Sequence, residues 1–103
     1  YEIGVSDRIT RLLGLGVRAG NVVIGVAGVR AGLQRGKLMC VVLAADAGQR
    51  TIDKVGRLAE ARKIPVLRGP VAAELGVRLG RPPVQAVGVA DRALARGLMS
   101  SEE

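Results

Sequence analysis

Apolar residues along this chain recur at two different spacings, and their alternation predicts helices separated by short strands. The first helical series consists of Ile9, Leu12, Leu13 and Val17. We expect Ser6 or Asp7 to cap this helix, because a short side-chain oxygen can accept a hydrogen bond from an otherwise unpaired backbone N–H. The segment 18–20 supplies an arginine and a glycine, which are typical of a helix end.

Residues 22–44 predict a strand, a helix and a second strand. The β-branched run 22–24 is too short for a helix and indicates a brief edge strand. A second helix is expected to begin at Gly25 and to end at the basic turn 34–37. Its narrow apolar stripe consists of Val26, Val29 and Leu33. The apolar run 41–44 then predicts a buried strand, which ends at the turn 46–48.

The second half of the chain continues this alternation. Thr51 is expected to cap a third helix that ends at Ile64-Pro65. The inward positions of this helix are Ile52, Val55 and Ala59. A short strand is expected at 66–67, and Pro70 should stand at the start of a fourth helix, where its missing N–H costs nothing.

The last predicted elements are a buried strand at 84–90 and a helix over 92–98 that Asp91 caps, followed by a frayed tail at 100–103. Helices that alternate with short apolar strands predict an α/β fold, a three-layer α/β/α sandwich around a small parallel or mixed sheet. With 103 residues, the chain is long enough for one core but not for two. Residues 1–103 are therefore expected to form a single domain.

The composition favours a packed, basic protein that binds a polyanion. Hydrophobic residues make up 49%, with no Phe or Trp and with Tyr1 as the only aromatic residue. The core must therefore be aliphatic, and binding of single strands by aromatic stacking is disfavoured. The net charge is +7, and thirteen of the sixteen cations are Arg, whose forked guanidinium suits phosphates and guanine edges. Nucleic acid is the favoured partner; a basic surface that merely aids solubility is the alternative.

Cys40 is the only cysteine, and the chain has no His. Because Cys40 stands in an apolar run, we interpret it as a small core residue. An internal disulfide and a zinc site of Cys and His are excluded, and we expect no metal and no cofactor. A lone cysteine fits a reducing cytoplasm, and the sequence shows neither a membrane span nor a signal peptide. The start at Tyr1 rather than Met hints at a piece of a longer chain.

Two glycine patterns invite other functions. Gly14, Gly16 and Gly20 are spaced GxGxxxG on a predicted helix, whereas a dinucleotide-binding motif follows a strand and opens a helix. Residues 25–28 form GxxG, as in single-strand-binding KH domains, but apolar residues stand between the glycines where those loops carry a cation. We interpret residues 25–28 as a helix start with small residues for close packing.

The order of these segments closely resembles the ribosomal protein L7Ae superfamily, in particular its bacterial YlxQ-type branch. The resemblance begins with the sequence LLGLGVRAGNVVIGVAGVRAGLQRGKLMCVVLAADA at 12–47. It returns at 64–66, 74–76 and 87–91, and so covers the chain from about residue 7 to residue 98. The resemblance implies an α/β/α sandwich with a four-stranded mixed sheet that binds structured RNA.

Relatives that bind kink-turn RNA place Gly-x-Asn-Glu-x-x-Lys at the start of the second helix, whose free N–H groups attract phosphates. Here Gly25 matches the glycine, but apolar or small residues replace the Asn, Glu and Lys, and Arg30 stands one residue before the Lys position. In the family, the loop before the last strand, here 80–85, packs against a flipped base. The RNA-binding residues that the resemblance implies are Gly25, Val26, Ala27, Gly28, Arg30, Ala31, Arg35, Lys37, Arg81, Pro82 and Pro83.

The first functional hypothesis is a small, non-catalytic, cytoplasmic protein that binds structured RNA of ribosomal type, with ribosomal or assembly proteins as further partners. The alternative is a protein-interaction or ribosome-assembly module of the same fold that has lost specific kink-turn recognition. A nucleotide-dependent enzyme is less favoured, because the chain has no phosphate-binding loop. Without His, with Cys40 in the core and with Asp46 as a turn or helix cap, we assign no catalytic residue.

Overall fold

Helices and strands alternate along residues 2–100, the part of the chain that the computed structural model describes; of residues 2–8 and 10 it describes the backbone alone. The elements are α1 (Glu2–Ala19), β1 (Val22–Ile24), α2 (Val26–Gln34), β2 (Cys40–Leu43), α3 (Gln49–Ala61), β3 (Val66–Arg68), α4 (Ala72–Leu79), β4 (Ala86–Val89) and α5 (Arg92–Ser100). This is the order that the apolar pattern predicts, with α2 beginning one residue after Gly25. No helix within the described range is both long and apolar enough to span a membrane.

The strands form one mixed sheet in the order β1-β4-β2-β3. Strand β4 is antiparallel to both of its neighbours, with Gly88 opposite Val23 of β1 and Val41 of β2, whereas β2 and β3 are parallel. Every residue of the central strands β2 and β4 is buried, and β1 lies at an edge of the sheet. The predicted edge strand and the predicted fold, a three-layer sandwich with a small mixed sheet, are confirmed.

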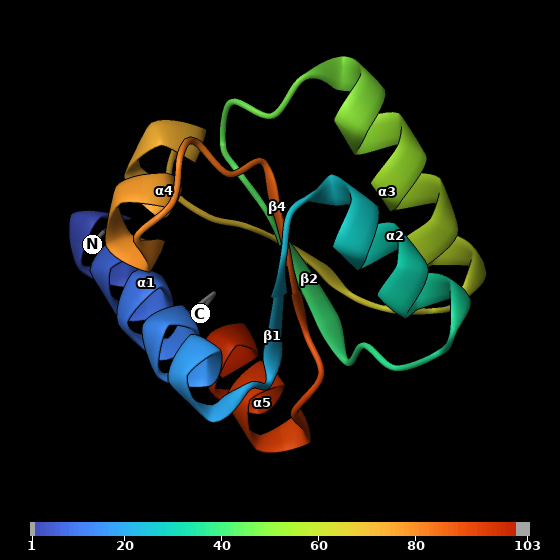
Figure 1. Ribbon diagram of the computed structural model, residues 1–103, viewed down its shortest axis with the longest axis horizontal. Helices are drawn as coiled ribbons and strands as arrows, with labels where there is room; N and C mark the ends of the chain where they lie inside the picture. Colours follow the sequence, from blue (N-terminus) through green and yellow to red (C-terminus); the bar gives the residue numbers. More distant parts are fainter. Residues whose placement is uncertain (1, 101–103) are drawn as a thin grey trace.

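Helices cover both faces of the sheet: α2 and α3 lie on one face, and α1, α4 and α5 lie on the other (Figure 1). Side chains of a strand alternate between the faces, so that Val41 and Leu43 join the α2–α3 core while Cys40 and Val42 join the opposite one. The α2–α3 core further contains Val29, Leu33, Leu38, Val55 and Ala59. The opposite core contains Ile9, Leu13, Leu75, Ala95 and Leu98, among others.

Cys40 has an exposed fraction of 0%, which confirms its interpretation as a small core residue. Burial raises the pKa of its thiol from 9.0 to about 11, because the charged thiolate is poorly solvated there. At neutral pH the side chain is therefore a neutral, apolar packing group and not a nucleophile.

The ends of α2 and α3 use the same backbone turn with different residues. After α2, Gly36 adopts φ +69°, and the N–H groups of Gly36 and Lys37 donate to the carbonyls of Leu33 and Gly32. This is the left-handed turn for which glycine is suited. After α3, Lys63 takes the corresponding place with φ 58°, and its N–H donates to the carbonyl of Glu60. A left-handed conformation is strained for a residue with a side chain.

Three predicted helix starts are wrong. Helix α1 begins at Glu2, so Ser6 and Asp7 lie inside it. Helix α3 begins at Gln49 after Gly48, and Thr51 lies in its first turn. Pro70 precedes α4 by two residues. A capping side chain contributes only a small free energy to a helix start, so it does not fix where the helix begins. At α4, a residue distant in the sequence supplies the cap.

That cap is Asp46, whose Oδ1 accepts a hydrogen bond of 2.7 Å from the N–H of Ala72, the first residue of α4. Asp46 follows β2, and the bond therefore ties the β2–α3 loop to a helix 26 residues further along the chain. Asp46 lies in the turn after β2, as expected, but a cap for the next helix is wrong: it caps α4 and not α3. The predicted cap of α5 is confirmed at Asp91, whose Oδ2 accepts from the N–H of Leu94 at 2.7 Å. Ser100 is the last residue of α5, and the rest of the expected tail lies outside the described residues.

Candidate functional site

The loop between α4 and β4 lies directly against α4. The N–H of Arg81 donates to the carbonyl of Gly76 at 2.7 Å, and the N–H of Val84 donates to the carbonyl of Ala72 at 3.0 Å. A Cβ at Gly76 would collide with the carbonyl oxygen of Pro82, so that only glycine lets the loop backbone pass this close. The side chain of Val84 is buried, which anchors the loop to the core.

The end of this loop is hydrogen-bonded to two other segments, and all three lie at the same end of the sheet's strands. Gln85 Oε1 accepts a hydrogen bond of 3.3 Å from the N–H of Gly48, at the start of α3. The carbonyl of Ala86 accepts a bond of 2.9 Å from the N–H of Gly25, immediately before α2. The loop 80–85 and the start of α2 are therefore held next to each other (Figure 1).

Gly25 starts α2 in a conformation that suits glycine alone, with φ +102° and ψ 154°. Its carbonyl accepts the first helical bond from the N–H of Val29, at 3.0 Å. The N–H groups of Val26, Ala27 and Gly28 thus have no acceptor within the helix. No acidic residue stands in the first turn of α2, and no side chain in the described part caps it. The start of α2 therefore carries positive potential that favours an anion.

Between this helix start and the loop lies an open hollow of about 380 Å³, which we call the Gly25 hollow. It is lined by Ile24, Gly25, Val26, Arg81, Pro82, Pro83, Val84 and Gln85. The structure thus brings together five of the residues expected from the sequence: Gly25, Val26, Arg81, Pro82 and Pro83. A guanidinium and the helix N–H groups can bind phosphate, while the exposed prolines offer an apolar surface to a base.

The remaining expected residues of α2 lie outside this hollow. Ala27 is exposed and Ala31 is half-buried. Arg30 is exposed, one helical turn after Val26. Arg35 and Lys37 lie past the opposite end of α2, roughly 13 Å away at 1.5 Å per residue. At that end, Arg62, which directly follows α3, donates to the carbonyl of Gln34 at 2.9 Å.

Gly28 faces β1. A Cβ built at Gly28 would lie 2.5 Å from Cγ1 of Val23, closer than two carbon atoms can approach. The position at which kink-turn-binding relatives carry Glu is therefore closed by a valine side chain. Sequence reasoning missed Val23, because nothing in its neighbourhood along the chain indicates which helix residue it meets. It also missed the loop-holding roles of Gly76 and Gln85; Gly76 stood within the motif 74–76, but without an assigned role.

No cluster of acidic, Cys or His side chains suited to a metal ion occurs among the described residues. Asp46, which follows β2, accepts a hydrogen bond from the start of α4.

Comparison with known proteins gives the family and agrees with the fold. The sequence profile of the ribosomal protein L7Ae/L30e/S12e/Gadd45 family matches residues 7–98. The fold is similar to that of a protein of unknown function from Bacillus halodurans, with a TM-score of 0.86 and 29% identity over 95% of this chain and 99% of that one. It is also similar to a 15.5 kD RNA-binding protein of Giardia lamblia, with a TM-score of 0.77 and 20% identity over 95% of this chain and 84% of that one. No curated protein sequence matches significantly.

Proposed function

Because the chain belongs to the ribosomal protein L7Ae/L30e/S12e/Gadd45 family, we propose that it is a small, non-catalytic protein that binds structured RNA of the ribosome in the cytoplasm. Family membership suggests RNA binding, and the similar Giardia lamblia protein is itself described as RNA-binding. We further assign the chain to the bacterial YlxQ-type branch, on the order of its motifs along residues 7–98. Ribosomal and assembly proteins are the further partners in this proposal.

The observation that carries the proposal is the Gly25 hollow. A phosphate binds at the start of α2, where Gly25, Val26 and Arg81 line the same hollow and the helix start has no side-chain cap. A base packs on Pro82 and Pro83. Arg30 contacts the backbone one turn further along α2, and Arg35 and Lys37 contact more distant phosphates at the other end of that helix.

A second function is supported by the same helix. Ala27 is exposed, and Val23 closes the position of the base-reading Glu. The start of α2 is therefore more apolar than an RNA reader requires. This favours, as the alternative, a protein-interaction or ribosome-assembly module that keeps the fold without specific kink-turn recognition.

Retention of the purified protein on immobilised ribosomal RNA across a salt series separates the two functions. For an RNA-binding protein with four phosphate contacts, the logarithm of the affinity should fall with the logarithm of the salt concentration, with a slope of magnitude about 3. Each phosphate contact contributes to this slope because it releases counterions. An interaction module gives weak retention at physiological salt, and that outcome would contradict the proposal.

A further inference from the structure

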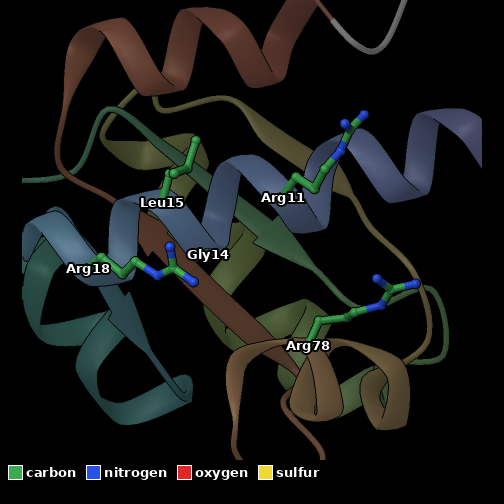
Figure 2. A pocket seen from close by; sticks show the side chains of 5 residues that line it. All are labelled: Arg11, Gly14, Leu15, Arg18 and Arg78. Carbon is green, nitrogen blue, oxygen red and sulfur yellow. The ribbon is translucent and has the colours of Figure 1, made fainter.

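A second basic surface lies on the opposite layer of the molecule, between α1 and α4. It is an open groove of about 330 Å³ lined by Arg11, Gly14, Leu15 and Arg18 of α1 and by Arg78 of α4 (Figure 2). We call it the arginine groove. The groove has free space at Gly14, because a Cβ built at this position would have no neighbouring heavy atom within 4 Å. Helices α1 and α4 pack against each other, so the backbone positions that carry these arginines are fixed relative to one another.

The described residues that line this groove include three Arg and no carboxylate, so the charged groups among them are all positive. In the sequence, Asp7 and Glu74 stand four residues before Arg11 and Arg78, a spacing at which an acid and a base pair along a helix. Arg18 has Gly14 at that spacing and therefore no acid one turn earlier. Figure 2 shows its guanidinium extended along α1 toward Gly14, at the groove. Arg18 therefore contributes the cation that most favours an anion at this groove.

The groove also offers an apolar contact. Leu15 is 59% exposed, and Val77, the neighbour of Arg78 on α4, is 77% exposed. The Gly25 hollow likewise combines an arginine, Arg81, with apolar side chains. This combination suits a nucleic-acid strand, whose phosphates and sugar edges alternate, better than a small free anion.

The two sites are linked through the end of α4. Arg78 lines the arginine groove and Arg81 lines the Gly25 hollow. They are three positions apart along the chain, so their Cα atoms lie at most about 11 Å from each other. A single RNA backbone that leaves the Gly25 hollow past Arg81 can therefore reach Arg78 and the groove beyond it.

From these observations we propose that the arginine groove is a second phosphate-binding site, which holds a further segment of the RNA that occupies the Gly25 hollow. The proposal rests on the proposed function, because it requires that the protein binds RNA. Its consequence is an RNA footprint that extends from the start of α2, across the end of α4, onto α1.

The test uses the double variant Arg11→Ala, Arg18→Ala and a bulged RNA duplex in two lengths. Arg78 is left unchanged because it has a partner within the fold. Removing two contacts should lower the salt slope by about 1.5 on the long duplex. On a duplex truncated close to the bulge the loss should be smaller, since that RNA does not reach the groove. Arg11→Lys, Arg18→Lys should keep the slope while weakening affinity, because Lys retains the charge without the fork.

The matched control is Arg57→Ala, Arg96→Ala, which removes the same charge from exposed positions outside both sites. Thermal unfolding should show all variants folded. An unchanged slope for Arg11→Ala, Arg18→Ala, or a loss equal to that of the control, would overturn the second site. So would poly-glutamate binding that depends on Arg11 and Arg18 while RNA binding does not, since the groove would then hold an acidic protein segment. A loss for this variant without any loss for Arg30→Ala, Arg81→Ala would support the groove and contradict the Gly25 hollow.

Discussion

Val23 of β1 occupies the space into which a side chain at position 28 of α2 would project. The Cβ of any residue placed at Gly28 would lie 2.5 Å from Cγ1 of Val23. A carboxylate side chain at this position would therefore collide with Val23 unless the valine side chain moved. Helix α2 and strand β1 form one packed unit in which the family's base-reading Glu cannot be accommodated unchanged.

Gly28→Glu should therefore destabilise the protein, although Gly in a helix interior is itself unfavourable. We expect a net loss of about 1–3 kcal/mol in the free energy of unfolding, as for other overpacked sites. Val23→Ala should reduce this loss, and a double-mutant cycle by urea unfolding measures the coupling. The control is Gly56→Ala in α3, where a Cβ meets nothing within 4 Å, and stability should rise by up to about 1 kcal/mol. Additive effects of Gly28→Glu and Val23→Ala would show that the two positions do not compete for space.

The wild-type protein should discriminate poorly between a standard kink-turn and a plain duplex. Ala27, Gly28 and Ala31 replace the Asn, Glu and Lys of the family pattern, and polar base contacts are worth roughly 1–3 kcal/mol each by analogy with groove recognition. Fluorescence titrations with both RNAs at one salt concentration measure the ratio of dissociation constants. A large preference for the kink-turn would show that other groups recognise its sheared base pairs.

Gly76→Ala should weaken RNA binding by displacing the loop that carries Arg81. The new Cβ would meet the backbone of residues 81 and 82, which cannot rotate away as a side-chain end can. We expect a loss of about 1–3 kcal/mol in stability together with a reduced RNA affinity of the protein that remains folded. Gly56→Ala again serves as the control for helix propensity. Unchanged affinity with reduced stability would mean that the loop position is unimportant for RNA.

The buried thiol of Cys40 should make the stability of the protein depend on pH. Because burial raises the pKa of Cys40 to about 11, the folded protein retains the thiol proton between pH 9 and 11 whereas the unfolded chain loses it. Stability should therefore fall as the pH rises through this window. Cys40→Ala should remove that part of the pH dependence, as measured by chemical denaturation at several pH values. At neutral pH the wild-type thiol should react with a thiol reagent only after unfolding; rapid reaction of the native protein would contradict its burial.

The order of the elements could be predicted from the sequence because each core face follows a local period, as in Val29 and Leu33 of α2. Helix starts were less predictable, since Asp46 caps α4 from a loop far away along the chain. The proximity of Gly25 to the loop 81–83 could be predicted from the family resemblance, but not from the spacing of residues along the chain. The contact between Val23 and the Gly28 position, and the groove shared by Arg18 and Arg78, depend on how elements pack, which no local pattern contains.

The central claim is that RNA binds at the Gly25 hollow and along α2 as far as Arg30, and the salt dependence of RNA binding by Arg30→Ala, Arg81→Ala tests it most directly. Both side chains are exposed, so the fold should remain intact. With two phosphate contacts removed, the slope of log affinity against log salt should fall by about 1.5, whereas Arg57→Ala, Arg96→Ala should change it far less. Equal losses for the two variants would mean diffuse attraction to a basic protein. An unchanged slope for Arg30→Ala, Arg81→Ala would show that the Gly25 hollow does not bind RNA.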